Sequence, residues 1–314
     1  MKTKIIVVSG PTATGKTDMS IRLAKKYNAS IINFDSLLFY REISIGTAKP
    51  SLQERKEIPH YMIDSHSIFN PINAADYFQQ TIPLIIELSK KSDNPIILVG
   101  GSGFYLQTIL KGMFDSKTSP DHVVEKSNKL YQQEGILPFL EILKAHDQAS
   151  YERYHENDHY RIRRAVEHWW STKTPFSESR EQMELKKQTA PPIVYGWDIL
   201  HLHLDVNKEL HWDIIQRRTS KMLENGIVEE VKGLLQQGAT GNEKPLKSIG
   251  YLEVFKYLNG EINDLDGLQE RINISTRQLA KAQRTWFKKV EKMSYNPLED
   301  WDKIESQVQE FLTL

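Results

Sequence analysis

Residues 4–17 read KIIVVSGPTATGKT, and this stretch decides the fold. Its first half, Ile5–Val8, is a continuous β-branched run, which is typical of a strand buried on both faces of a parallel sheet. Its second half, Gly10–Thr17, matches the phosphate-loop pattern G-x-x-x-x-G-K-[ST] at every fixed position. A strand, a glycine-rich loop and a following helix together predict a backbone cradle for a diphosphate or triphosphate. We therefore expect chemistry on a phosphorylated ligand.

Strands alternate with helices in the first third of the chain. Further strands are predicted at Ile31–Phe34, Tyr61–Ile63 and Ile96–Val99, because each is a short apolar run. Helices are predicted from Lys16 to near Asn28 and over Ala74–Leu88. This alternation predicts an α/β fold, with a P-loop core built on a doubly wound parallel sheet.

The strand signal disappears in the middle of the chain. Residues 115–189 are polar, helical in pattern and rich in Arg, His, Tyr and Trp, which indicates an inserted, mainly helical domain. Ile193–Val206 alternates enough to be a strand that returns to the core, and Asn207–Phe287 reads as several helices separated by glycines. The catalytic core is thus expected to comprise 1–114 and 190–314.

Composition excludes several classes of function. The chain holds 41 basic and 41 acidic residues, so any attraction to nucleic acid must come from a local basic surface. It has no cysteine, which excludes disulfides, thiol nucleophiles and Cys-ligated zinc. The apolar run near the N-terminus is too short for a signal-peptide core or a membrane span. We expect a cytoplasmic monomer without a membrane partner.

A phosphate loop does not specify a reaction. NTPases pair it with a strand that ends in a Walker B aspartate, whereas Ile96–Val99 runs into Gly-Gly-Ser. This leaves a small-molecule kinase, or a transferase whose leaving group is diphosphate. Asp35 follows the strand Ile31–Phe34 and would lie at the carboxyl edge of the sheet, on the side of the loop. There it is either a base beside the bound phosphates or a cap of a helix or turn, and its position leaves both alternatives open.

Two local basic clusters stand out against the neutral total. The stretch 271–292 holds seven basic residues and one acidic residue. Four of the seven, at spacings of 4, 3 and 4, would share one helix face: Arg277, Lys281, Arg284 and Lys288. Such a stripe can follow a phosphate backbone, although a solvated face is the commoner explanation. The second cluster, Arg161, Arg163 and Arg164, alternates with Tyr and Trp, which suits either an unpaired RNA loop or an apolar helix face.

Histidines form two pairs, His155 with His159 and His201 with His203. Each pair resembles half of a metal site, but no cysteine or carboxylate pattern accompanies either one. We therefore expect solvent-facing or capping roles for all four.

The phosphate loop and the run Asp35–Pro50 together resemble the tRNA dimethylallyltransferases, also called tRNA isopentenyltransferases. The resemblance continues in order through further blocks: His60–Asp64, Asn73–Tyr77, Val99–Leu106, His155–Asp158, Arg161, Arg164–Glu167, Ser248–Tyr251 and Thr276–Trp286. These blocks lie in order over nearly the whole chain. The resemblance is to the bacterial type, which has no zinc-finger extension.

This resemblance implies transfer of a dimethylallyl group from its diphosphate to N6 of adenosine 37, beside the anticodon of tRNAs that read UNN codons. The implied partners are the anticodon stem-loop of tRNA and dimethylallyl diphosphate, and the implied cofactor is Mg²⁺. The chemistry is consistent, because an allylic diphosphate develops carbocation character once its leaving group is stabilised.

Residue roles follow from the same resemblance. Asp35 would accept the proton from N6, Thr12 and Lys16 would hold the diphosphate, and Ser102 would stand beside the reacting base. Diphosphate binding is implied for the loop and one arginine: Gly10, Pro11, Thr12, Ala13, Thr14, Gly15, Lys16, Thr17 and Arg218. Thr17 is also the implied Mg²⁺ ligand. Binding of tRNA is implied for Asp35, Ser36, Leu37, Leu38, Gly101, Ser102, Arg161, Arg164, Ser248, Gly250, Tyr251, Arg277, Gln278, Lys281 and Arg284.

The chain departs from the family pattern at two positions. Ser102 stands where a threonine is usual, and Ile214 stands where relatives usually carry an arginine, so Arg217 or Arg218 would have to supply that contact. Two other classes of protein compete with the transferase. A P-loop nucleotide or metabolite kinase would share the loop and Asp35 but would not need the basic helix. A non-catalytic RNA-binding module would not need an intact loop.

Overall fold

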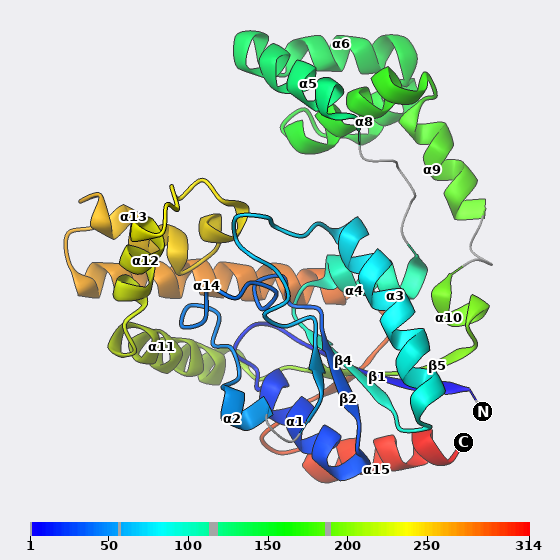
Figure 1. Cartoon of the computed structure of the whole chain (residues 1–314), viewed down its shortest axis with the longest axis vertical. Coiled ribbons are helices and arrows are strands. Elements are labelled where there is room, and N and C mark those ends of the chain that lie inside the picture. The colour runs from blue at the N-terminus through cyan, green and yellow to red at the C-terminus, as the bar shows by residue number, and fades with distance from the viewer. Residues whose placement is uncertain (1, 56–57, 113–118, 186–189) are drawn as a thin grey trace. The chain divides into compact units, whose positions relative to one another are not determined.

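The computed structural model describes residues 2–55, 58–112, 119–185 and 190–314. The chain divides into two compact units (Figure 1). One combines Met1–Leu110 with Pro191–Leu314, and the other is Lys111–Ala190. The expected limits of the inserted domain, 115 and 189, lie outside the described residues.

Among the described residues, six strands form one sheet in the first unit, in the order β3-β2-β4-β1-β5-β6. Their bounds are β1 Thr3–Ser9, β2 Ser30–Asn33, β3 His60–Tyr61, β4 Ile96–Gly100, β5 Trp197–Leu204 and β6 Met293–Tyr295. Each strand is parallel to its neighbours. The apolar run 5–8 of β1 is fully buried, as its composition requires at the centre of a parallel sheet. The predicted α/β fold with a parallel sheet is confirmed.

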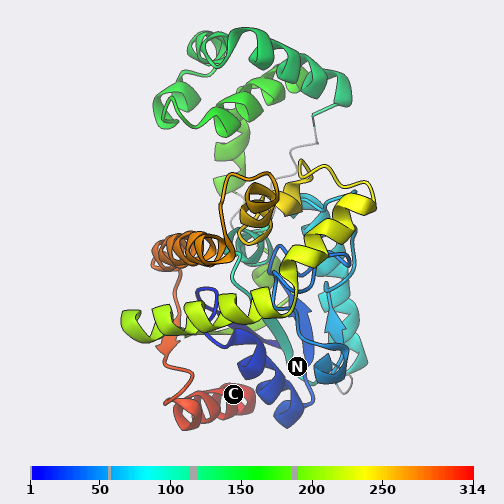
Figure 2. The same ribbon diagram turned by 90° about the vertical axis from the view of Figure 1, so that its left-hand side faces the viewer.

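Helices cover both faces of this sheet. The steps from β1 to β2 and from β3 to β4 run in opposite directions across it, so right-handed crossovers place α1 (Lys16–Tyr27) and α3 (Ala74–Lys91) on opposite faces. α15 (Trp301–Thr313) lies beside α1 in both views (Figures 1 and 2). Its Ile304 and Val308 complete the apolar core that α1 shares with the sheet. The sheet is therefore doubly wound.

The first unit also contains these helices: α2 (Leu52–Arg55), α4 (Gly103–Lys111), α10 (Pro191–Val194), α11 (Lys208–Glu224), α12 (Ile227–Gln236), the 3₁₀ helix η2 (Lys244–Lys247), α13 (Tyr251–Leu258) and α14 (Leu265–Phe287). The strand expected from Ile193 begins later, as β5. Pro191 and Pro192 favour the first turn of a helix instead, and Gly196 (φ 64°) ends it. No helix in the described part of the chain combines the length and apolarity that crossing a membrane requires.

The second unit, called the helical unit below, contains five helices in its described residues: α5 (Asp121–Glu134), α6 (Leu137–His146), α7 (Gln148–Arg153), α8 (His159–Thr172) and α9 (Phe176–Leu185). It has a core of its own, formed by the fully buried Phe139, Leu143, Ile162, Ala165 and Val166. The apolar face of α8, one of the two explanations for its sequence, thus packs inside this unit.

Candidate active site

Four neighbouring parallel strands have their carboxyl ends along the same side of the sheet, which we call the sheet edge. A residue of chemical interest follows each of these strands. Asp35 follows β2, Gly101 follows β4, the loop Gly10–Thr17 follows β1, and Asp205 follows β5. These positions are close in space. A Cβ atom built on Gly101 would lie 3.5 Å from both Asp35 Oδ2 and the carbonyl oxygen of Gly10. The edge therefore unites the phosphate loop with the candidate base, as parallel-sheet topology predicts.

The phosphate loop needs its two glycines for different reasons. Gly10 has φ 153°, and a Cβ there would lie 2.2 Å from Leu204 O, so no side chain fits. Gly15 has φ 74°, a left-handed backbone conformation that favours glycine. It is the N-cap of α1, and no side-chain hydrogen bond caps the helix there among the described residues. Within the loop, Thr14 Oγ1 donates to Pro11 O (2.9 Å). The first N–H groups of α1 are thus available to an anion, and the helix dipole favours negative charge there.

Two cations stand over this loop. Lys16 Nζ donates to Pro11 O (2.6 Å), and Arg218 Nη1 donates to Thr12 Oγ1 (3.2 Å). Both side chains keep some exposed surface, but protein atoms surround their charged ends. Burial lowers the pKa of Lys16 to about 8; Asp35 opposes this shift and Arg218 adds to it. Burial also lowers the pKa of Arg218. A bound polyanion would relieve both cations, so the charges of the site favour one.

Arg218 also accounts for the departure at Ile214. The two residues are one turn apart on the same face of α11, and Arg218 Nη2 donates to Thr47 O (3.2 Å). Arg217 is exposed. Of the two arginines that the sequence offered as substitutes, Arg218 is the one that lies at the loop.

Asp35 forms a turn and also faces the site, so the two alternatives left by its position do not exclude each other. Its Oδ1 accepts the N–H of Leu37 (3.3 Å), which makes an Asx turn. Its Oδ2 lies on the side of Gly101. Ser102 Oγ accepts the N–H of Ser36 (3.1 Å). The edge thereby gathers six of the residues with an implied tRNA contact: Asp35, Ser36, Leu37, Leu38, Gly101 and Ser102.

The loop after β2 is held by α12 and α13. Glu230 Oε2 accepts two successive backbone N–H groups of this loop (2.9 and 3.0 Å). Tyr251 OH donates to Glu230 Oε1 (2.6 Å) and accepts the N–H of Gly46 (3.1 Å). Tyr251 is fully buried, so it supports the loop from behind. Ser248 and Gly250 lie just before α13, where Ser248 Oγ donates to a backbone carbonyl (2.5 Å) and Gly250 N–H to a glutamate (2.7 Å).

The basic residues of α14 do not share one environment. Arg284 faces the sheet edge and donates to both carboxylate oxygens of Asp205 (2.6 to 3.0 Å). Arg277 pairs with an acid of its own helix (3.3 Å). Gln278 and Lys281 are exposed and line a shallow groove on the outer face of the helix. The predicted stripe is therefore divided between the site and the surface.

Sequence reasoning missed two residues that hold Thr12. His211 Nε2 donates to Thr12 O (2.8 Å), and its Nδ1 accepts from Arg284 (2.8 Å). Because arginine can only donate and a carbonyl can only accept, His211 is neutral with its proton on Nε2. Burial lowers the pKa of His211, consistent with that state. The other residue, Gln283, accepts the N–H of Thr12 (2.8 Å). Gln283 lies inside the block that carries the family resemblance, whereas no motif marks His211.

The expectation for one histidine pair was wrong. His201 and His203 are buried rather than solvent-facing, and both hydrogen-bond to Ser9 Oγ (2.6 and 2.9 Å). The reason is that β5 lies inside the sheet and that Phe287 of α14 packs against both rings. Burial lowers the pKa of each to about 4. His159 begins α8 and pairs with a tyrosine hydroxyl (2.7 Å). No three His, Asp or Glu side chains meet as a metal site would need within the described ranges.

The predicted arginines of the helical unit make local contacts. Arg161 pairs with Asp158 (2.6 Å) and keeps 66% of its side chain exposed. Arg164 pairs with the buried Glu167 (2.9 Å) and also reaches Ser119 Oγ (3.4 Å). Both lie on α8, Arg161 with the more exposed side chain of the two.

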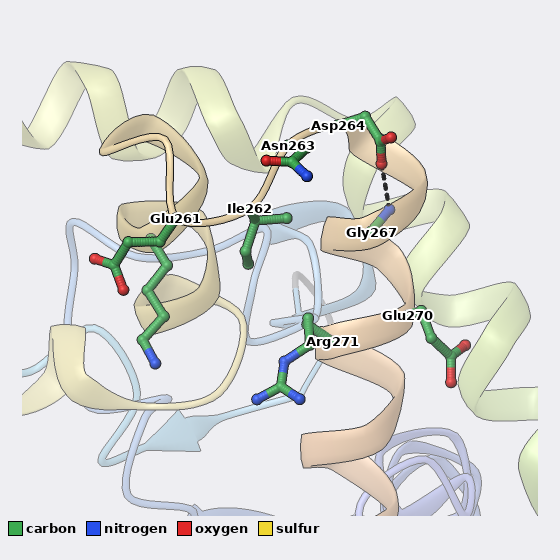
Figure 3. Close-up of a pocket in the computed structure, with 8 residues that line it drawn as sticks. Glu261, Ile262, Asn263, Asp264, Gly267, Glu270 and Arg271 are labelled. Carbon is green, nitrogen blue, oxygen red and sulfur yellow. Dashed lines mark hydrogen bonds between the residues drawn. The ribbon is translucent and has the colours of Figure 1, made fainter.

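A separate depression of about 600 Å³ lies between the end of α13 and the start of α14. It is lined by Lys256, residues 261–264, and Gly267, Glu270 and Arg271. Figure 3 shows Glu261 and Glu270 pointing to opposite sides of it, and Asp264 caps α14 by accepting the N–H of Gly267 (2.7 Å). Its lining includes none of the sequence-predicted site residues, so we assign it no chemistry.

Over most of its length the chain is similar to proteins of one family. A family model described as IPP transferase matches residues 38–290. The chain is 36% identical to a tRNA dimethylallyltransferase of Nostoc punctiforme over 98% of this chain and 97% of that protein. It is 35% identical to tRNA dimethylallyltransferase 2 of Geotalea uraniireducens over 92% and 90%. Among solved structures, a eukaryotic dimethylallyltransferase acting on tRNA superimposes with a TM-score of 0.80 at 27% identity, over 98% of this chain and 78% of that one.

Proposed function

The chain belongs to the IPP transferase family, and from this premise we propose that it transfers the dimethylallyl group of dimethylallyl diphosphate to N6 of adenosine 37 in tRNAs that read UNN codons. The products are N6-isopentenyladenosine and diphosphate. Relatives named as tRNA dimethylallyltransferases support this prenyl transfer over the kinase alternative.

One observation carries the proposal. Two enclosed cations, Lys16 and Arg218, stand over the phosphate loop, and a carboxylate lies across the same edge. This arrangement suits a diphosphate leaving group with a base a short distance away. A hydrolytic NTPase would need a Walker B acid after β4, and β4 ends in glycine.

The proposed reaction assigns each group one task. N6 attacks C1 of the donor, the C1–O bond breaks, and its electron pair leaves with the diphosphate. The N6 proton passes to Asp35. Lys16 and Arg218 neutralise the charge that develops on the diphosphate, together with the Thr12 hydroxyl that Arg218 orients. Ser102 stands beside the adenine, next to the turn that holds Asp35.

Mg²⁺ belongs to the proposal. The Thr17 hydroxyl, in the first turn of α1, would hold it together with oxygens of the diphosphate and water, a ligand set that suits this cation. When bound, Mg²⁺ supplies positive charge to the leaving group. Thr17 is half-buried and follows Lys16 directly, which fits this role.

The partner we propose is the anticodon stem-loop of tRNA. Adenosine 37 has to leave its stack before N6 can reach a base at the sheet edge. Arg161 and Arg164 of the helical unit, and Gln278 and Lys281 on the outer face of α14, are the proposed contacts to the RNA. Action as a cytoplasmic monomer is part of the same proposal.

A labelling assay tests the function. The protein is incubated with unmodified tRNA and dimethylallyl diphosphate labelled in the prenyl group, and in parallel with γ-labelled ATP and a nucleoside mixture. We expect label in the tRNA and in N6-isopentenyladenosine after digestion. Label transferred from ATP would support the kinase instead, and no transfer from either donor would leave an RNA-binding module.

A further inference from the structure

Thr12 of the phosphate loop is held through all three of its polar groups. Its N–H donates to Gln283 Oε1 (2.8 Å), its carbonyl accepts from His211 Nε2 (2.8 Å), and its Oγ1 accepts from Arg218 Nη1 (3.2 Å). These partners come from α11 and α14, far from the loop in sequence. The position of the loop is thus set by side chains from outside it.

Gln283 differs from the other two partners in where its second contact lies: His211 also bonds to Arg284 and Arg218 also bonds to Thr47 O, whereas Gln283 reaches the turn beside Asp35. Its Nε2 donates to Gly101 O (3.0 Å), in the turn after β4. The orientation of the amide is unambiguous, since the N–H of Thr12 can only donate and the carbonyl of Gly101 can only accept. One half-buried amide therefore joins the loop after β1 to the turn after β4.

That turn lies against the candidate base. A Cβ on Gly101 would lie 2.6 Å from Gln283 Nε2 and 3.5 Å from Asp35 Oδ2, so glycine is what lets the amide approach. One helical turn further on, Trp286 packs on Gly103 so closely that a Cβ there would lie 2.2 Å from its ring. The last turns of α14 are thus fixed against the segment between the base and the loop.

We infer that Gln283 is a positioning residue for the transfer: its side-chain amide sets the distance between the phosphate loop, which holds the donor, and the turn beside Asp35, which receives the proton. The inference rests on the proposed function. Gln283 itself touches neither reacting group. Its contribution is geometric, and a misplacement of about 1 Å can cost on the order of 100-fold in rate.

The first test replaces the amide by an apolar side chain of similar size. Gln283→Met keeps the length and helix propensity but removes both hydrogen bonds. We expect kcat at saturating donor and tRNA to fall about 10- to 100-fold, with dissociation constants for inorganic diphosphate and for tRNA within about threefold of wild type. Gln236→Met, on the exposed end of α12, is the matched control and should change none of these quantities.

The second test uses a charge that can be titrated. Gln283→Glu accepts the N–H of Thr12 at any pH but can donate to Gly101 O only when it is protonated. We therefore expect its kcat, divided by that of wild type at the same pH, to rise at least fivefold from pH 8 to pH 5.5. The ratio removes the pH dependence that both proteins share. A merely structural role would not produce this pH dependence.

The outcomes are separable. A kcat for Gln283→Met within twofold of wild type, or losses of diphosphate affinity equal to the loss of kcat, would overturn the inference. If Gln283→Met does not fold, the test rests on Gln283→Glu. A ratio of its kcat to that of wild type that does not change with pH would then be enough to overturn the inference. If wild type itself transfers no dimethylallyl group to tRNA, the proposed function fails first.

Discussion

The sheet edge and the helical unit hold their charged residues in opposite ways. At the edge, Lys16 and Arg218 are enclosed, and Thr12 is fixed by three side chains from two helices. In the helical unit, Arg161 is 66% exposed and pairs with Asp158, three residues away. Enclosed, fixed groups suit a chemical step whose rate depends on geometry. Exposed cations suit binding of a polyanion, in which each contact adds a small amount of affinity that falls as the salt concentration rises. Mutations in the two regions should therefore affect different kinetic constants.

The largest expected effect lies at the edge. Asp35→Asn keeps the shape of the side chain and the Asx turn but removes the base, so kcat should fall about 10²- to 10⁴-fold. The dissociation constant for tRNA should stay within about threefold. Single-turnover transfer and filter binding measure the two quantities, with Asp93→Asn as the control in an exposed loop. A rate within fivefold of wild type would assign the proton transfer to another group.

Removal of an enclosed cation should affect the donor alone. Arg218→Met loses a charge-assisted contact to the diphosphate, and the affinity for inorganic diphosphate should fall about 10- to 100-fold. Affinity for tRNA should not change. The neighbouring Arg217→Met removes an exposed charge from the same helix and should have little effect on calorimetric titration with diphosphate. Equal losses in the two variants would contradict the placement of Arg218 in the site.

The pKa of Lys16 predicts how donor binding depends on pH. The free protein loses this proton near pH 8, whereas a bound diphosphate favours the charged form. Above pH 8, binding must then take up a proton, so the dissociation constant for dimethylallyl diphosphate should rise about tenfold per pH unit. Lys16→Arg stays charged throughout and serves as the reference. If the dissociation constant of wild type divided by that of Lys16→Arg did not change from pH 7 to 9.5, Lys16 would be charged in the free protein over this whole range.

The smallest effect is expected in the helical unit. Arg161→Gln should weaken tRNA binding several-fold and lower its salt dependence, because one phosphate contact is lost. At saturating tRNA, kcat should stay within twofold. Arg153→Gln, an exposed arginine of α7, is the matched control. If Arg161→Gln lowered kcat without affecting tRNA affinity, the division of labour between the two regions would be wrong.

The sequence predicted the parts of the fold that depend on local pattern. The run Ile5–Val8, the loop after it and the helices after residue 207 are where hydrophobic period and glycines indicated. The motif also predicted that Lys16 lies in the phosphate loop, and the predicted sheet topology put Asp35 at the same sheet edge. Contacts between distant segments were not predictable, because nothing in the local pattern around His211 or Gln283 indicates that both would meet Thr12.

The two histidines of β5 illustrate the same limit. Alternation along a strand shows that His201 and His203 share a face, but not whether that face meets water. Here Phe287, more than eighty residues away in the chain, packs against both rings, and both rings hydrogen-bond to Ser9.

A crystal structure of the protein with a non-reactive thio analogue of dimethylallyl diphosphate would test the central claim most directly. We predict the diphosphate within hydrogen-bond distance of Lys16 and Arg218, with C1 of the prenyl chain on the side of Asp35. An empty loop at saturating analogue, or ATP bound there in preference to it, would contradict the account.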